Sequence, residues 1–186
     1  MSASVRPRRS VLYMPGANTR ALEKARSLPA DALIFDLEDA VAPDAKEAAR
    51  ANVVAAAQSK GYGKREIAIR CNGLSTPWGK ADIAAIAKSG ADAVLVPKVE
   101  TAEEVASVVA QLDAVGAPKS MAVWAMMETP KGILRADEVA GSHPRLTLFV
   151  MGTNDLVKDM RARHTPMRLP MVTALGLGDR KSTRLN

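Results

Sequence analysis

The chain has 186 residues, 47% of them hydrophobic and 25% charged, with a formal net charge of +6 and a single cysteine, Cys71. This length and composition indicate a globular domain with a substantial core, and the lone cysteine excludes an internal disulfide and a zinc site built from several cysteines. No apolar run approaches the roughly 20 residues that a membrane helix needs. The opening MSASVRPRRS lacks the apolar core of a secretory signal, so we expect a cytoplasmic protein.

The positive charge is concentrated at the two ends of the chain. Arg6, Arg8 and Arg9 lie near the start, and the basic stretch DRKSTRLN closes the chain. Only two Phe, two Tyr and two Trp are available to stack on bases, so nucleic-acid binding is not expected. A basic interaction protein that uses the arginine-rich ends is one alternative function.

Six apolar runs typical of β-strands follow one another along the chain. They span residues 10–16, 30–39, 66–73, 91–100, 121–129 and 146–155. Segments of helical composition separate them, at 19–28, 43–60, 77–90, 101–116 and 131–142. Because a parallel return needs a crossover and a helix supplies it, the alternation predicts an α/β fold with six β/α units.

Polar residues stand at the end of nearly every predicted strand. Two architectures fit the alternation, an open doubly wound sheet and a (β/α)8 TIM barrel. The open sheet usually carries G-x-G-x-x-G after its first strand, and this chain has PGANTR there. Barrel enzymes assemble their sites from the carboxyl ends of several strands, so the distribution favours the barrel. The strand-end residues are Tyr13, Asp36, Glu38, Asp39, Arg70, Asn72, Lys98, Glu100, Glu128 and Asp155.

An ordered set of motifs resembles a known family. RSVLYMPG, LEKA, FDLEDAVAPDAKEAAR, GADAVLVPKVE and GTNDL occur together with Arg70-x-Asn72, the TPW at 76–78 and Glu128-Thr129. From about Arg9 to about Leu177 the set resembles the CoA-ester lyases of the citrate lyase β-subunit type, in the HpcH/HpaI aldolase superfamily. That group includes malyl-CoA and citramalyl-CoA lyases. Each motif alone is weak, and their order makes the resemblance specific.

The resemblance implies an enzyme that depends on Mg²⁺, or on Mn²⁺, and cleaves or forms a carbon–carbon bond next to a CoA thioester. Its substrate would be a 3-hydroxyacyl-CoA such as malyl-, citramalyl- or citryl-CoA, and its products an acyl-CoA and a 2-oxo acid. The resemblance also implies a homo-oligomer, a trimer or hexamer, for the intact parent protein. No membrane partner is expected.

The resemblance assigns roles to particular residues of this chain. Glu128 and Asp155 would be the direct metal ligands, and Arg70 would hold the substrate carboxylate or the developing enolate oxygen. Around them, Glu38 and Asp39, with Asp36 nearby, would fix metal-bound waters or orient Arg70. The residues expected to contact CoA are Tyr13, Arg20, Lys24 and Lys46, with Arg50 beside Lys46 on the second helix.

The chemistry of these residue types agrees with the assigned roles. Magnesium prefers oxygen ligands and keeps several waters, so two carboxylates leave positions for a bidentate 2-oxo acid. A forked, permanently charged guanidinium such as that of Arg70 suits a carboxylate better than lysine does. We therefore expect the six side chains Asp36, Glu38, Asp39, Arg70, Glu128 and Asp155 to serve one reaction.

Several alternatives stay open at this point. The acidic residues Asp36, Glu38 and Asp39 would also suit the start of the following helix, and Asp155 would suit the N-cap of a helix starting at Leu156. Lys98 could form a Schiff base and run aldol chemistry without metal. Other functions are a catalytically silent fragment that binds CoA or metal, a related acyl-CoA thioesterase, and a metal-dependent 2-oxo acid aldolase.

The end of the chain departs from the family pattern. A closed barrel of this type has eight strands, whereas six are visible, so we expect an incomplete barrel domain over residues 1–178. The helical pattern of PMVTALGLG is expected to end at Asp179, and residues 179–186 to be a non-native tail. The first and sixth strands would then be unpaired edges. In the family an acid–base carboxylate comes from the further C-terminal part, so we expect this chain to be unstable or self-associating and of low activity.

Overall fold

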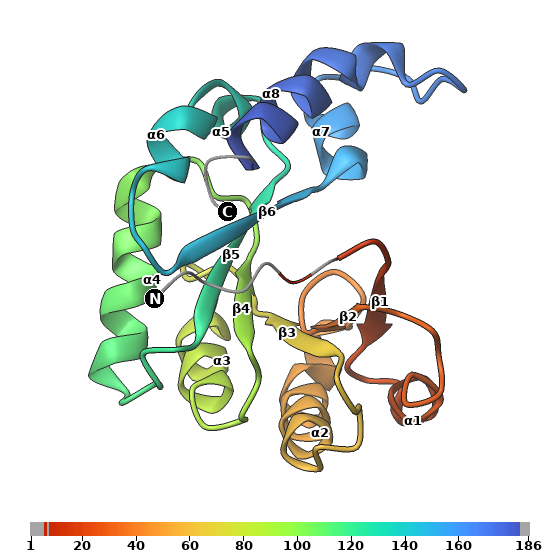
Figure 1. Ribbon diagram of the computed structural model, residues 1–186, viewed down its shortest axis with the longest axis vertical. Helices are drawn as coiled ribbons and strands as arrows, with labels where there is room; N and C mark the ends of the chain where they lie inside the picture. The colour runs from red at the N-terminus through yellow and green to blue at the C-terminus, as the bar shows by residue number, and fades with distance from the viewer. Residues whose placement is uncertain (1–5, 7, 183–186) are drawn as a thin grey trace. The chain divides into compact units, whose positions relative to one another are not determined.

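The computed structural model describes residues 6 and 8–182 and divides the chain into two compact units (Figure 1). The first unit holds residues 1–95 and 111–122, and the second holds 96–110 and 123–186. Six strands occur in a sheet in the chain order β1 to β6, and helices connect them. The predicted α/β fold with six β/α units is confirmed.

The strands of the first unit finish at neighbouring positions. They are β1 (Val11–Pro15), β2 (Ala32–Asp36), β3 (Glu66–Arg70) and β4 (Ala93–Val96), whose last residue belongs to the second unit. All pair in parallel, and the register places Pro15 beside Asp36 and Asp36 beside Arg70. The last residues of three strands therefore lie side by side, so an acidic and a basic side chain become neighbours.

Small apolar side chains pack the helices of the first unit onto its strands. Every residue of β2 and β3 is buried, and Ala49, Val53 and Ala57 form the buried face of α2 at a spacing of four residues. Helix α2 lies between α1 and α3 and contacts both (Figure 1). The helical elements are α1 (Thr19–Lys24), the 3-10 turn η1 (Pro43–Ala45), α2 (Lys46–Gln58) and α3 (Gly79–Ile86).

Strand β1 is the outer strand of the first unit. Its residues Val11, Leu12 and Tyr13 are 38%, 36% and 39% exposed, whereas the neighbouring β2 is fully buried. The order of strands leaves β1 and β6 at the two ends of the sheet, as the sequence predicts.

The second unit carries β5 (Ala122–Met127) and β6 (Leu146–Met151), which pair in parallel with an irregularity between Val123 and Trp124. Helix α4 (Ala102–Ala114) begins in this unit and ends in the first. The remaining elements are α5 (Pro130–Leu134), α6 (Ala136–Ala140), α7 (Thr153–Asp159), the 3-10 turn η2 (Leu169–Met171) and α8 (Val172–Ser182).

Two predicted helix boundaries in the second unit are wrong. The segment 131–142 forms two short helices because Arg135, with φ −102° and ψ 13°, leaves the helical conformation between them. Helix α8 continues past Gly178 to Ser182, so it does not end at Asp179. The proposal that 179–186 is a non-native tail stays a prediction, and residues 183–186 of it lie outside the described residues.

None of the helices within the described residues has the length and apolar character needed to cross a membrane.

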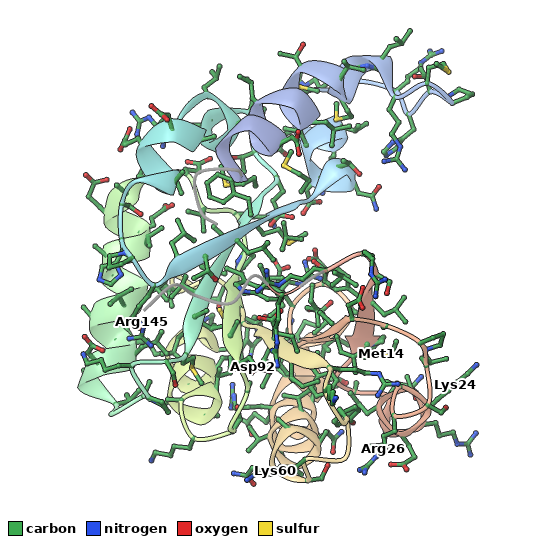
Figure 2. The ribbon with its side chains drawn as sticks, viewed as in Figure 1. Met14, Lys24, Arg26, Lys60, Asp92 and Arg145 are labelled. Atoms are coloured by element: carbon green, nitrogen blue, oxygen red, sulfur yellow. The ribbon has the colours of Figure 1, made fainter. Side chains whose placement is uncertain are left out.

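Acidic residues at the amino ends of the strands hold the basic start of the chain. Arg8 donates two hydrogen bonds to the nearly buried Glu66, at 2.5 and 2.9 Å. Arg6 lies 3.6 Å from Asp92, which is labelled in Figure 2. Arg9 pairs with Asp31 at 3.0 Å, and the hydrogen bond from Arg9 lowers the pKa of this carboxyl to about 2. These contacts speak against a free basic arm that binds polyanions.

Replacing Arg8 with Met is expected to lower the free energy of unfolding by about 2 kcal/mol, the range for a lost hydrogen bond to a charged group. The reason is that the Glu66 side chain is only 8% exposed and would lose its bidentate partner. Urea unfolding followed by circular dichroism measures the change. Lys119→Met, which breaks the exposed pair with Asp113, should shift the transition little. Equal shifts for the two variants would contradict this role of Arg8.

Candidate active site

A bidentate ion pair joins the ends of β2 and β3. Arg70 Nε lies 2.7 Å from Asp36 Oδ1, and Arg70 Nη2 lies 2.5 Å from Asp36 Oδ2. Both residues are buried, with 5% and 1% of their surface exposed. The parallel register that makes them neighbours therefore fixes the plane of the guanidinium.

The other two acidic residues after β2 lie at the remaining nitrogen of the guanidinium. Arg70 Nη1 is 2.7 Å from Glu38 Oε2 and 3.5 Å from Asp39 Oδ2. The Tyr13 ring centre lies 5.4 Å from the guanidinium carbon, within the range of a cation–π contact. The side chain of Asp39 is 58% exposed. The Nη1 end of Arg70 is therefore the end closest to solvent.

These contacts decide one of the alternatives. Asp36 accepts the backbone N–H groups of Glu38 at 2.8 Å and of Ala40 at 3.3 Å, so it shapes the turn after β2. Neither η1 nor α2 has a side-chain cap at its start. The interpretation of the acidic residues as caps of the following helix is wrong.

Arg70 stays charged in this environment. Burial disfavours the charged form, but the hydrogen bonds and the charge of Asp36, together with the charge of Glu38, outweigh it and raise the pKa of Arg70. Three carboxylates contact this one guanidinium. The bidentate pair with Asp36 fixes the orientation of the cation, and a cation oriented in advance can stabilise a negative charge that develops beside it.

The Lys46 side chain bonds to the loop that follows β2. Its ammonium donates to the backbone carbonyls of Leu37 at 2.8 Å and Glu38 at 2.7 Å. Lys46 is 6% exposed, and burial lowers its pKa, opposed by the charges of Glu38 and Asp36. The sequence suggested a CoA contact for Lys46, and the structure places the ammonium inside the protein.

A second buried carboxylate, Asp82 on α3, was missed in the sequence. It is fully buried, accepts Arg50 Nε at 2.6 Å, and accepts both the backbone N–H and the side-chain amide of Asn72, at 2.9 and 2.6 Å. Asn72 also donates to the Leu37 carbonyl at 3.0 Å. In the sequence Asp82 looks like an ordinary acidic residue in the first turn of a helix. The only available signal was its position on the helix face that also carries Ile83 and Ile86.

Of the other residues expected to contact CoA, Arg20 and Lys24 lie exposed on α1, whereas Tyr13 lies at the guanidinium of Arg70 and Arg50 pairs with Asp82. Figure 2 labels Lys24 on α1. Arg20 and Lys24 are open to solvent, as a contact with a soluble phosphate group requires.

In the second unit, Glu128 directly follows β5 and is 1% exposed. Its Oε1 accepts the backbone N–H of Lys98 at 2.9 Å. A Cβ atom on Gly152 would lie 2.5 Å from Glu128 Cβ and 2.6 Å from Glu128 Oε2. The absence of a side chain at Gly152, at the start of the GTNDL motif, therefore leaves the room that this carboxylate occupies.

Asp155 lies in the first turn of α7. The helix begins at Thr153 with Gly152 as N-cap residue, so the alternative in which Asp155 caps a helix starting at Leu156 is wrong. The Asp155 side chain is 27% exposed, and its Oδ2 lies 3.9 Å from Lys98 Nζ. Lys98 thus contacts Glu128 through its backbone and Asp155 through its ammonium.

The donor set in the second unit fits a hard divalent cation. Glu128 and Asp155 offer carboxylate oxygens, one fixed by burial and one reachable from solvent, and magnesium is commonly held by one or two carboxylates and several waters. Among the described residues, no group of three or more His, Cys, Asp or Glu side chains could hold a metal ion. A magnesium site in this part of the chain would therefore use two protein carboxylates and complete its shell with water or substrate.

Comparisons with known proteins agree with the motifs. The family described as HpcH/HpaI aldolase/citrate lyase matches residues 9–176. A (3S)-malyl-CoA thioesterase from Cereibacter sphaeroides is 50% identical over 177 residues, which cover 95% of this chain and 60% of that protein. Citrate lyase subunit beta from Escherichia coli is 39% identical over 166 residues, which cover 87% of this chain and 55% of that protein.

Among solved structures, CitE from Mycobacterium tuberculosis in complex with magnesium and pyruvate matches with a TM-score of 0.79 at 23% identity, over 98% of this chain and 72% of that chain. This likeness shows the fold. The chain spans between 52% and 60% of the length of the curated relatives it matches. The matched residues cover nearly the whole chain, and the chain belongs to the HpcH/HpaI aldolase/citrate lyase family.

Proposed function

We propose that the chain belongs to a magnesium-dependent carbon–carbon lyase, which cleaves a 3-hydroxyacyl-CoA of the malyl-CoA type into an acyl-CoA and a 2-oxo acid. The observation that carries the proposal is the pair of carboxylates in the second unit, Glu128 held by a backbone N–H and Asp155 partly exposed. Magnesium and pyruvate, a 2-oxo acid, in the similar solved structure support the metal and the product class. The name of the 50% identical relative supports a CoA thioester as substrate.

Glu128 and Asp155 would hold the ion through one oxygen each. The carboxylate of Glu128 is held in place. The Lys98 N–H binds one of its oxygens, and the close approach of Gly152 limits where the other can lie. A magnesium ion bound there would supply Lewis-acid polarisation of the 2-oxo acid carbonyl and a template for its carboxylate.

Arg70 would act on the negative charge of the substrate. Asp36 occupies its Nε and Nη2 atoms, and Glu38 and Asp39 contact Nη1. A substrate carboxylate or the enolate oxygen of the departing acyl-CoA would approach from the Nη1 side, next to these two carboxylates. A guanidinium oriented before the reaction stabilises such charge without reorganising. Glu38 and Asp39 would orient the Nη1 atom of Arg70, and the Tyr13 ring would pack against the face of the guanidinium.

Arg20 and Lys24 would pair with the phosphates of CoA because both are exposed. We do not extend this role to Lys46, whose ammonium is bonded inside the protein. A homo-oligomeric parent protein, a cytoplasmic location and the use of Mn²⁺ in place of Mg²⁺ stay predictions.

A thioesterase is the second candidate, favoured by the name of the 50% identical relative. In that reaction water would cleave the thioester of the same substrate, and its carbon–carbon bond would stay intact. A covalent thioester on cysteine is not supported, since Cys71 is fully buried and burial raises the pKa of its thiol.

Product analysis separates the candidates. The chain is incubated with (3S)-malyl-CoA and magnesium, and the products are resolved by chromatography. We expect acetyl-CoA and glyoxylate, lost on chelation and restored by magnesium, whereas malate and free CoA would favour hydrolysis. Equal turnover in a chelator, or borohydride trapping of the substrate on Lys98, would contradict the metal-dependent route.

A further inference from the structure

One residue contacts both carboxylates of the proposed metal site. The backbone N–H of Lys98 donates to Glu128 Oε1 at 2.9 Å, and its side-chain Nζ lies 3.9 Å from Asp155 Oδ2. The motif GADAVLVPKVE placed a lysine at this strand end, and neither metal binding nor thioester cleavage assigns it a role.

The backbone of Lys98 adopts an uncommon conformation. Its φ is 52°, in the left-handed region that residues other than glycine rarely adopt. The backbone is fixed on either side, since Glu128 accepts the Lys98 N–H and the next residue, Val99, donates to the Met126 carbonyl at 3.2 Å. A strained backbone that persists at a candidate site is a reason to look for a function there.

The side chain of Lys98 lies partly in solvent and contacts Asp155. It is 53% exposed, and its 3.9 Å separation from Asp155 is typical of a weak surface ion pair. Such an ammonium partly neutralises the charge of the Asp155 carboxylate. A divalent cation at the same carboxylate would repel it.

We propose that the Lys98 ammonium is an internal counter-ion of Asp155 in the ion-free protein, and that a divalent cation at Glu128 and Asp155 displaces it. The inference rests on the metal site proposed above. Lys98 is then a positioning residue: its backbone fixes one ligand, and its side chain lowers the repulsion between the two carboxylates until the ion arrives.

The test measures Mn²⁺ binding to the 186-residue chain by electron paramagnetic resonance. Lys98→Met removes the competing ammonium and keeps an unbranched side chain, so the backbone strain is unchanged. We expect Mn²⁺ to bind roughly two- to fivefold more tightly, the range that an exposed ion pair contributes. Lys98→Arg, which keeps the charge, should bind Mn²⁺ like the wild type. Unchanged or weaker binding by Lys98→Met would overturn the inference.

Lys131→Met is the matched control, because Lys131 is 55% exposed and pairs with Glu100 at 2.9 Å in the same unit. Its Mn²⁺ affinity should stay at the wild-type value, and an equal gain would overturn the role of Lys98. Circular dichroism confirms that each variant is folded, with Lys98→Gln as a second neutral variant.

The failure of the inference is distinguishable from the failure of the metal site. Loss of Mn²⁺ binding in Glu128→Gln and Asp155→Asn, with no gain in Lys98→Met, would remove only the counter-ion role. Mn²⁺ binding that none of these three variants changes would remove the metal site itself, and the inference with it.

Discussion

Replacing Arg70 with Met is expected to lower the free energy of unfolding by about 3–5 kcal/mol, the range for breaking a buried ion pair by removing one partner. The reason is that Asp36, 1% exposed, would lose its bidentate guanidinium partner inside the protein, and Glu38 would lose its contact at 2.7 Å. Urea unfolding followed by circular dichroism measures the change. Any lyase or thioesterase activity should be lost as well.

Two further variants sharpen this prediction. Arg70→Lys keeps the charge but not the fork that matches the Asp36 carboxylate, so its loss should be intermediate. Arg9→Met breaks a comparable arginine–aspartate pair, but the Arg9 side chain is 80% exposed, and the unfolding transition should move little. If Arg70→Met and Arg9→Met unfold at the same urea concentration, the contacts of Arg70 with Asp36 and Glu38 do not stabilise the fold more than an exposed ion pair does.

Glu128→Gln and Asp155→Asn are each expected to weaken Mn²⁺ binding by at least about a hundredfold. That loss exceeds the ten- to hundredfold effect typical of removing a partner outside the direct ligands. Both substitutions preserve shape, and the amide oxygen introduced by Glu128→Gln can still accept the Lys98 N–H, so the fold should be retained. Titration calorimetry with Mn²⁺ and Mg²⁺ gives the affinities.

Glu100→Gln is the control for these ligand variants. Glu100 also follows a strand of the sheet, its side chain is 27% exposed, and Lys131 lowers the pKa of its carboxyl through a hydrogen bond. Because its charge is already paired with Lys131, its removal should leave metal affinity unchanged. Equal losses for Glu100→Gln and Glu128→Gln would point to a general charge effect instead of a defined ion site.

The strands were predictable because their signal is local. Each is a short run of apolar residues, and those of β2 and β3 are buried on both faces, as strands covered by helices are. The pair of Asp36 and Arg70 depends on the parallel register of β2 and β3, which no local pattern predicts. The fold class was therefore available from the sequence, whereas this pairing was not.

The buried polar contacts behind Arg70 were not predictable in the same way. Lys46 and Arg50 have the four-residue spacing of a solvated helix face, yet one donates to two carbonyls and the other to a fully buried Asp82. Burial of such groups depends on which helix lies alongside, here α3 beside α2. A helical pattern in one segment carries no information about its neighbour.

The rejected capping roles failed for a related reason. Whether Asp155 caps a helix depends on where that helix begins, and α7 begins at Thr153, two residues before Asp155. The acidic residues after β2 precede η1, whose start has no side-chain cap, and they turn back to Arg70 instead. Composition favours acidic residues near a helix start, but the exact first residue is set by backbone geometry.

Crystals of the chain grown with Mn²⁺, with anomalous diffraction recorded at the manganese edge, test the central claim most directly. We predict one manganese peak with an oxygen of Glu128 and an oxygen of Asp155 each at about 2.0–2.2 Å, the distance of small divalent cations from carboxylates. A peak held by Asp36, Glu38 and Asp39 instead, or no peak in contact with Glu128, would contradict it.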